Sequence, residues 1–265
     1  MSRRIVILGG GPMGTAIAVG LRKSQLGSEL RVVEIDAERR RVLSEKYQIE
    51  ASETHVPAAG DVVVLAIQPQ AFQSFAAGLA PNAYSECLLI SVMAGIRIET
   101  MCHALGTNQV VRSIPNTPSE VMQGMTVLCP GHAVEKPNID LARDILGSFG
   151  KALVVTREEA IDDATALCGG GPAFVAFYAK GMFDFAVECG FEPNDARTMV
   201  AQVLRGTADL LAVTGKEPLV LCKEVMTPNG TTERGIWHYR ERELDTIVTA
   251  ALRRSAARSR ELSGV

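Results

Sequence analysis

Three closely spaced glycines near the start of the chain have the spacing of a phosphate-binding loop. Gly9, Gly11 and Gly14 form the pattern G-x-G-x-x-G directly after the apolar run of residues 5–8. In such a loop the first glycine permits a tight turn, the second lets a pyrophosphate approach the backbone, and the third lets a helix pack closely on a strand. The amide N–H groups at the start of that helix can then hold the phosphate charge. The pattern alone is weak, because glycine-rich turns also form for simple packing.

An acidic residue strengthens the interpretation as a dinucleotide site. Glu34 ends the next apolar run, about 20 residues after the last glycine, which is the context that dinucleotide binding requires. A carboxylate there can bind both ribose hydroxyls of NAD and repels the 2′-phosphate of NADP. Arg39, Arg40 and Arg41 follow a helical turn later; they either reach such a phosphate or form a solvated helix face, and we favour the solvated face. We therefore expect NADH or NADPH as cofactor, with NADH favoured. The residues expected at the cofactor from this motif are Gly9, Gly11, Pro12, Met13, Gly14 and Glu34.

Alternating strands and helices must position this loop. Up to about residue 155 we expect strands at residues 4–8, 30–34, 61–67, 88–92 and 109–113, with helices at residues 13–23, 37–47, 69–79 and 98–105. Strand runs such as residues 62–67 are almost continuously apolar, which indicates burial on both faces and hence a parallel sheet. Residues 125–128 and 152–155 are expected to extend the sheet at one edge. Residues 1–155 are therefore predicted to form a doubly wound α/β domain that binds the dinucleotide.

The second part of the chain has a different pattern. From residue 156 onward strand-like runs disappear, and helices are expected at residues 172–189, 194–214 and 237–262. The segment 173–187 is apolar on most of its circumference, so as a helix it must be buried in its own domain or against a partner chain. A small helical domain has difficulty covering such a surface alone. Residues 156–265 are therefore predicted to form an all-α dimerisation and substrate domain, in a homodimer or higher homo-oligomer.

The composition and the spacing of cysteines and histidines disfavour several classes of protein and of site. The formal net charge of −3, without a basic stripe, disfavours nucleic-acid binding. The sequence has no apolar run of the length that a membrane span needs. The 6 cysteines lie far apart, which favours reduced thiols in a cytoplasmic protein and gives no CxxC metal pair. The 4 histidines are scattered without metal-binding spacing, so we expect no metal site.

Four further segments carry a recognisable pattern. They are residues 66–70 (A-I-Q-P-Q), 112–118 (R-S-I-P-N-T-P), 168–173 (C-G-G-G-P-A) and 227–232 (T-P-N-G-T-T). In this order they resemble the pyrroline-5-carboxylate reductase family over nearly the whole chain, and P-N-T-P is the most specific single match. That family reduces the cyclic imine 1-pyrroline-5-carboxylate to proline with a nicotinamide cofactor. The resemblance implies an N-terminal Rossmann-type doubly wound sheet followed by an all-α dimerisation domain.

The resemblance also implies roles for individual residues. It places Ala66, Gln68, Pro69 and Ala94 at the cofactor, and Glu158, Thr227, Gly230, Thr231 and Thr232 at the substrate. Thr232 is the candidate catalytic residue, which would position or polarise the imine nitrogen; its alternative role is to cap a helix. Asn116 lies in a loop after an expected strand, at the carboxyl end where open α/β sheets bind ligands, and we expect it to bind the cofactor. Its alternative role is in a structural turn.

Several positions depart from the family's pattern. They are Cys168 and Gly170 in place of two serines, Gln68 in place of a lysine, and Asn229 in place of a glycine. Glu224 and Glu233 add carboxylates near a site that is expected to bind an anion. Two alternatives therefore stay open: a reductase of a different cyclic imine, and a catalytically idle NAD(P)-binding regulator. The presence of Asn116, Thr231 and Thr232 argues against the regulator.

Overall fold

The computed structural model describes residues 3–26 and 29–264. The backbone divides into two compact units. One unit comprises Met1–Pro172 together with Arg253–Val265, and we call it the sheet unit. The other comprises Ala173–Leu252, and we call it the helical unit. The domain boundary between residues 155 and 156 stays a prediction.

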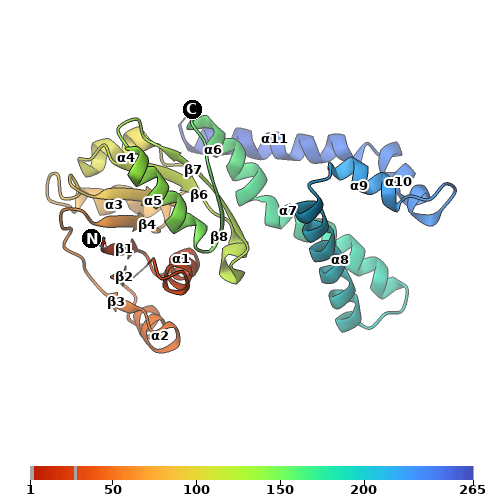
Figure 1. The fold of residues 1–265 in the computed structure, drawn as a ribbon, viewed down its shortest axis with the longest axis horizontal. Coiled ribbons are helices and arrows are strands. Elements are labelled where there is room, and N and C mark those ends of the chain that lie inside the picture. The colour runs from red at the N-terminus through yellow and green to blue at the C-terminus, as the bar shows by residue number, and fades with distance from the viewer. Residues whose placement is uncertain (1–2, 27–28, 265) are drawn as a thin grey trace. The chain divides into compact units, whose positions relative to one another are not determined.

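The described part of the sheet unit contains an eight-stranded sheet in the order β3-β2-β1-β4-β5-β6-β7-β8 (Figure 1). The strands are β1 (Ile5–Leu8), β2 (Leu30–Val33), β3 (Glu50–Ser52), β4 (Val62–Leu65), β5 (Leu88–Ser91), β6 (Val110–Ile114), β7 (Gly124–Pro130) and β8 (Gly150–Val154). The pairs from β3 to β6 are parallel, β7 runs antiparallel to β6, and β8 pairs parallel with β7. This arrangement confirms the predicted Rossmann-type sheet and its extension by two strands at one edge.

Helices cover both faces of this sheet because alternate strand side chains point to opposite faces. Ile5 and Ile7 pack with α1 (Pro12–Lys23), α2 (Ala37–Tyr47) and α5 (Lys136–Gly147) in one buried cluster. Val6 and Leu8 pack on the other face, with residues of α3 (Phe72–Ala77) and α4 (Ile98–Leu105). Every strand residue in β1, β4 and β5 is buried, as the continuous apolar runs predicted.

The sequence patterns missed several elements of the sheet unit. The three-residue strand β3 is partly exposed and carries no apolar run, and α5 was not expected. Between the sheet and the next long helix lie α6 (Glu159–Ala164) and a π-helical turn, η3 (Thr165–Gly169), which were also not expected.

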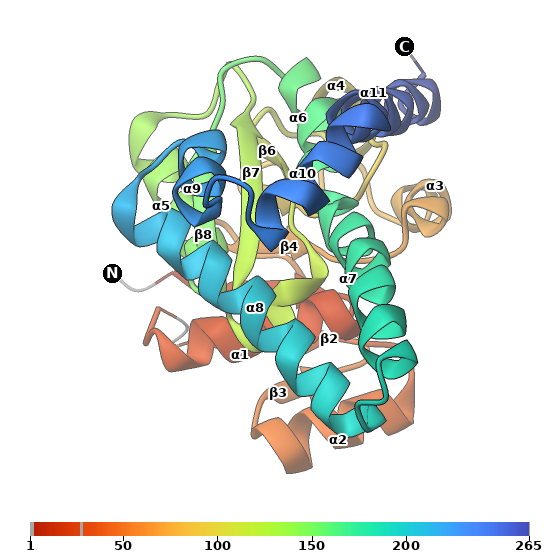
Figure 2. The same ribbon diagram turned by 90° about the vertical axis from the view of Figure 1, so that its right-hand side faces the viewer.

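The helical unit contains most of α7 (Gly171–Glu188), then α8 (Pro193–Thr214), α9 (Pro218–Val225), α10 (Thr231–Glu241) and the first part of α11 (Leu244–Leu262), as Figures 1 and 2 show. The expectation of a single helix over residues 237–262 is wrong. The chain breaks between α10 and α11, where Glu243 has a left-handed φ of 50°. No glycine or proline marks this break in the sequence. Among the helices of the described residues, none has both the length and the apolar composition that crossing a membrane requires.

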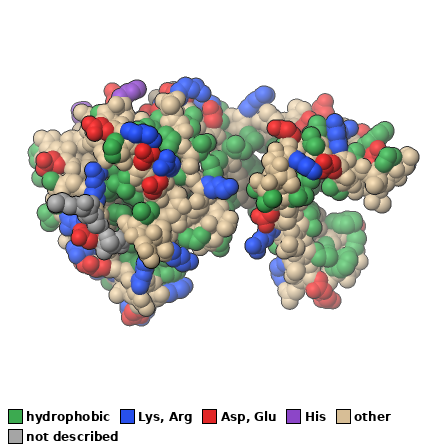
Figure 3. All heavy atoms as spheres, in the orientation of Figure 1, with side chains coloured by type: hydrophobic (Ala, Val, Ile, Leu, Met, Phe, Trp, Pro, Cys, Tyr) green, Lys and Arg blue, Asp and Glu red, His purple; other side chains and the backbone are tan. Residues whose placement is uncertain are grey.

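The helical unit leaves many large apolar side chains uncovered. Phe177 is 78% exposed and Phe185 is 67% exposed, both on α7. Val213 on α8 and Trp237 on α10 are also exposed. Apolar side chains, green in Figure 3, are visible over this unit. A surface of this kind is typical of a region that packs against another protein chain.

Candidate functional site

The glycine loop after β1 is shaped by two close backbone approaches. Gly9 has a φ of +109°, and a Cβ at this position would lie 2.5 Å from the carbonyl oxygen of Ala66. A Cβ at Gly14 would lie 1.9 Å from the carbonyl oxygen of Gly9. Only glycine fits at these two positions. Gly9 has a positive φ that residues with a side chain rarely adopt, and Gly14 lies where α1 packs directly onto the end of β1. Gly9 also donates from its amide to the carbonyl of Val33, at 2.8 Å.

Gly11 differs from the other two glycines of the motif. It is the N-cap residue of α1, and no heavy atom lies within 4 Å of the position that its Cβ would take. No side chain caps α1, and Pro12 occupies the first turn. The first amides of α1 therefore face a space with no protein acceptor from a capping side chain. This space, at the positive end of a helix, fits a dinucleotide pyrophosphate.

The Glu34 carboxylate lies beside the glycine loop and is only 6% exposed. Its Oε2 accepts a hydrogen bond from the Gly10 amide at 2.8 Å, and its Oε1 accepts one from the Asp36 amide at 2.9 Å. Both bonds hold the charged carboxylate at the carboxyl end of β2. Gly10 makes this approach possible, because a Cβ there would lie 3.1 Å from the Glu34 Cβ.

The three arginines of α2 have separate partners. Arg39 places Nη1 3.7 Å from the Glu34 Oε2. Arg40 donates to the backbone carbonyls of Glu34 and Ile35, at 2.7 and 2.8 Å. Arg41 pairs with Glu38 and Glu45 on the surface of the helix. Arg41 therefore forms the solvated helix face that the sequence favoured, whereas Arg39 and Arg40 pack against the end of β2.

The other predicted cofactor residues of the sheet unit lie along the same edge. Gln68 is the exposed N-cap of the short helix η1 (Pro69–Ala71), directly after β4. Ala94 is exposed in the loop after β5. Because β1, β2, β4 and β5 are parallel, their carboxyl ends meet at one edge, where open α/β sheets bind ligands. The loops and first helical turns that follow these four strands thus bring together Gly9, Gly11, Pro12, Met13, Gly14, Glu34, Ala66, Gln68, Pro69 and Ala94.

Asn116 follows β6 and uses its side-chain amide within the protein. Its Oδ1 accepts from the Met125 amide at 2.9 Å, and its Nδ2 donates to the Cys168 carbonyl at 3.1 Å. This is the structural alternative for Asn116, since it connects β7 with η3. Burial raises the pKa of the Cys168 thiol, which keeps the thiol protonated and disfavours a nucleophilic role.

Glu158 precedes α6 and is bound to two partners inside the sheet unit. Its Oε1 accepts from the Ile98 amide at 2.9 Å and from Arg112 Nη1 at 3.0 Å. The sequence interpretation missed Arg112, which is 1% exposed and lies on β6. An arginine inside an apolar strand run was the available signal, because a buried guanidinium needs carboxylate partners.

The loop before α10 belongs to the helical unit. Gly230 is the N-cap of α10, and its amide donates to the Thr227 carbonyl at 2.9 Å. A Cβ at Gly230 would lie 2.2 Å from the Thr227 hydroxyl oxygen, so that side chain requires a glycine here. Thr231 and Thr232 are the first two residues of the helix, and no side chain caps it. Thr232 therefore does not occupy the capping position that was its alternative role.

The two added carboxylates of this region have defined partners. Glu224 pairs with Lys216, with Oε2 2.7 Å from Nζ. Glu233 turns back over the start of α10, where its Oε2 accepts from the Asn229 amide at 2.8 Å. Asn229 itself has a left-handed φ of 62°. A negative charge thus lies beside the loop that is predicted to bind a substrate carboxylate.

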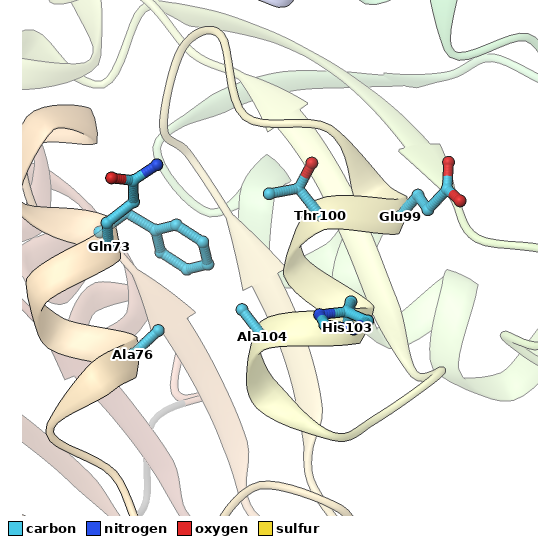
Figure 4. A pocket seen from close by; sticks show the side chains of 7 residues that line it. Gln73, Ala76, Glu99, Thr100, His103 and Ala104 are labelled. Atoms are coloured by element: carbon cyan, nitrogen blue, oxygen red, sulfur yellow. The ribbon is translucent and has the colours of Figure 1, made fainter.

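A hollow of about 480 Å³ lies elsewhere in the sheet unit, between α3 and α4 (Figure 4). Phe72, Gln73 and Ala76 line it from α3, and Glu99, Thr100, His103 and Ala104 line it from α4. None of these residues belongs to the predicted cofactor or substrate set. The hollow is therefore distinct from the edge that carries the glycine loop.

Comparisons with known proteins match both parts of the chain. Residues 158–262 match the family model described as pyrroline-5-carboxylate reductase dimerisation, and residues 4–95 match the model described as NADP oxidoreductase, coenzyme F420-dependent. The chain is 32% identical to a pyrroline-5-carboxylate reductase of Pseudomonas aeruginosa over 98% of this chain and 97% of the relative. It is 31% identical to a reductase of the same name from Synechocystis, with 99% of each chain covered.

Solved structures agree with these matches. A pyrroline-5-carboxylate reductase of Coxiella burnetii has a TM-score of 0.89 at 28% identity, and the match covers 99% of each chain. The Plasmodium falciparum pyrroline carboxylate reductase with NADP bound shares the fold, with a TM-score of 0.82 at 21% identity over 98% of each chain. The predicted succession of a dinucleotide-binding sheet and a helical dimerisation region is confirmed. This chain belongs to the pyrroline-5-carboxylate reductase family.

Proposed function

We propose that this protein is an oxidoreductase that transfers a hydride from NAD(P)H to the C=N bond of 1-pyrroline-5-carboxylate and so forms L-proline. The observation that carries the proposal is the similarity to reductases of this name along nearly the whole chain. The matched length includes both the glycine loop of the sheet unit and the loop of residues 227–232. The proposal therefore does not rest on similarity in one part of the chain alone.

The cofactor end of the reaction is assigned to the sheet unit. The bound nicotinamide cofactor supplies the hydride. The open space at Gly11 and the first amides of α1 hold its pyrophosphate. Glu34 holds its carboxylate at the end of β2, where it accepts hydrogen bonds from ribose hydroxyls and repels a 2′-phosphate. We therefore assign NADH as the preferred cofactor.

The substrate end is assigned to the start of α10. The backbone amides of Gly230 and Thr231 hold the substrate carboxylate at the positive end of the helix. The Thr232 hydroxyl hydrogen-bonds the ring nitrogen and positions it for reduction. A protonated imine is already electrophilic, so the chemistry needs no separate side-chain acid.

We propose that the helical unit forms the contact between subunits. Its exposed aromatic side chains on α7 fit the dimerisation region of the family, and we propose a homodimer or a higher homo-oligomer built through this unit. We assign the protein to the cytoplasm, in keeping with its six free cysteines.

One observation favours a second candidate, a reductase of a different cyclic imine. The Glu233 carboxylate accepts a hydrogen bond from the Asn229 amide and so adds negative charge beside the proposed carboxylate loop. Such a charge weakens the binding of an anionic substrate. It favours a cyclic imine whose carboxylate is absent or differently placed.

A cofactor-oxidation assay tests both candidates. NADH and NADPH oxidation is measured with 1-pyrroline-5-carboxylate, its six-membered homologue, and the cyclic imine without a carboxylate. The highest kcat/KM is expected with 1-pyrroline-5-carboxylate and NADH. A higher value with another imine selects the second candidate. Cofactor binding without turnover of any of these imines contradicts both and leaves the idle regulator.

A further inference from the structure

Four charged side chains, of which two are buried and two are half-buried, lie beside the cofactor edge of the sheet unit. Arg112 on β6 donates from Nη2 to the Asp162 Oδ1 at 3.1 Å and from Nη1 to the Glu158 Oε1 at 3.0 Å. Arg97 lies within ion-pair distance of the same two carboxylates, at 3.8 Å from Asp162 and 3.9 Å from Glu158. Asp162 is fully buried. We call Arg97, Arg112, Glu158 and Asp162 the charge cluster.

The last turn of the chain closes over the charge cluster. Ser259, at the end of α11, donates to the Asp162 Oδ1 at 2.9 Å. Ser263 lies 3.1 Å from the same oxygen and accepts from Arg112 Nη2 at 3.4 Å. Ser259 is itself buried. These two hydroxyls come about a hundred residues after Asp162 in the sequence, so the contact is purely tertiary.

The same turn and the same cluster lie beside the loop after β5. The main chain of Leu262 passes beside Gly95, where a Cβ would lie 3.5 Å from the Leu262 carbonyl oxygen. The loop ends at Ile98, whose amide donates to Glu158, and at Arg97, the N-cap of α4. The loop thus has the C-terminal turn on one side and the charge cluster at its end. It includes Ala94, at the carboxyl end of a central parallel strand.

We propose that the C-terminal turn, residues 259–263, is a clamp that positions the β5–α4 loop for cofactor binding. Ser259 and Ser263 orient the Asp162 carboxylate, which fixes Arg112, and Arg112 in turn fixes the Glu158 carboxylate that holds the Ile98 amide. Asp162 Oδ1 accepts three hydrogen bonds, from Ser259, Ser263 and Arg112, whereas its buried Oδ2 accepts none from the described residues. Losing the two hydroxyls leaves the buried carboxylate with the Arg112 bond alone and so loosens the whole group. Ser259, Ser263, Asp162 and Arg112 are positioning residues, and none of them has to touch the cofactor.

The inference rests on the proposed function only in that the loop must serve a bound cofactor. The double variant Ser259→Ala with Ser263→Ala removes the hydroxyls and keeps the charges and the helix. Ser255→Ala is the matched control, on the same helix and without a side-chain hydrogen bond to the cluster in the described residues. Ser263→Thr retains a hydroxyl and is the conservative variant.

Two measurements on the full-length proteins test whether residues 259–263 position the loop. Hydrogen–deuterium exchange at the Ile98 amide is expected to be about tenfold faster in the double variant. Its hydrogen bond to the Glu158 carboxylate then breaks more often, because that carboxylate is no longer held in place. The Kd for NADH, from fluorescence titration, is expected to rise about fivefold or more. The control is expected to match the wild type in both, and Ser263→Thr to stay close to it. A lower melting temperature with unchanged exchange and unchanged Kd overturns the proposal, because the hydroxyls then only stabilise the fold.

The outcome is separable from that of the proposed function. A wild-type protein that binds NADH but reduces no cyclic imine contradicts the proposed function, while exchange and Kd still decide about the clamp. A wild-type protein that turns over the imine, with a double variant of unchanged exchange and Kd, contradicts the clamp alone. Wild-type protein that binds neither NADH nor NADPH overturns both.

Discussion

The Glu34 carboxylate accepts a hydrogen bond from the amide of Gly10, with 2.8 Å between Oε2 and N. This bond joins the end of β2 to the glycine loop after β1. It leaves a nearly buried negative charge at the place where this fold receives the adenine ribose. The glycine loop and Glu34, the residue that we propose discriminates between cofactors, are therefore one hydrogen-bonded unit.

Replacement of Glu34 by glutamine should relax the choice between cofactors. The wild type is expected to prefer NADH by about tenfold or more in Kd and in kcat/KM, because the carboxylate repels a 2′-phosphate. Glu34→Gln keeps an acceptor and removes the charge, so the NADPH value should improve. Glu38→Gln on α2, where Glu38 pairs with Arg41, is the control and should change neither value. A clear NADPH advantage in the wild type would mean that Arg39 leaves Glu34 for the phosphate.

Two alanine variants of the glycine loop should affect different properties, one the affinity for the cofactor and the other the stability of the fold. Gly11→Ala adds a methyl group in open space, so the fold should be unchanged while the Kd for NADH rises about tenfold or more. Gly14→Ala places the methyl group 1.9 Å from the Gly9 carbonyl oxygen and should destabilise the fold by about 3 kcal/mol. Thermal unfolding and cofactor titration on the same preparations separate the two effects. Unchanged affinity in folded Gly11→Ala contradicts the proposed phosphate site.

Thr232→Ala should impair turnover without affecting the fold. Loss of one hydrogen bond to the reacting group should lower kcat/KM by about 10-fold to 100-fold. The melting temperature and the Kd for NADH should stay unchanged, because Gly230, not Thr232, is the N-cap of α10. Thr249→Ala removes a hydroxyl that bonds only the Asp245 carbonyl of its own helix and is the control. Normal steady-state rates in Thr232→Ala would exclude it from the active site.

The oligomer should depend on the aromatic face of α7. Sedimentation of the wild type at low micromolar concentration is expected to show no monomer. The Phe177 and Phe185 side chains are exposed in the single chain, and we expect a second subunit to cover them. Phe177→Glu should weaken the association by about 2 kcal/mol, since buried aromatic residues dominate interface energies. A stable, well-folded wild-type monomer refutes this assignment.

The stability of the sheet unit should fall as the pH drops below neutral. The His55 side chain is 3% exposed, and its Nε2 lies 3.4 Å from the Asp61 Oδ2. Burial, together with the positive charge of Arg4, lowers the pKa of His55, although Asp61 opposes the shift. The unfolded chain then takes up a proton near pH 6.5 that the folded chain resists, so stability falls as the pH drops through this value toward the lowered pKa of the folded chain. Melting temperatures of the wild type and His55→Gln over this range check the prediction, and the variant should show the smaller dependence. Equal dependences would show that Asp61 compensates fully.

Local requirements made much of the fold readable from the sequence. The helices at residues 37–47 and 98–105 were predicted with the observed bounds. Asp36 caps the first of them by accepting from the Arg39 amide at 2.8 Å, and Gly106 ends the second in the left-handed conformation. Such signals act within one turn of backbone. The break at Glu243 carries no such signal, and so it was missed.

The glycine loop was determined by the sequence itself, because its demands are those of the backbone. A φ of +109° at Gly9 and the missing space at Gly14 can be met only by residues without a side chain. The charge cluster was decided by the tertiary structure alone. Arg112, Asp162 and Ser259 come from a strand and two helices that lie far apart in the sequence, and no spacing rule connects them. Folding brings Arg112 and Asp162 together because a guanidinium and a carboxylate that are both buried must be paired inside the protein.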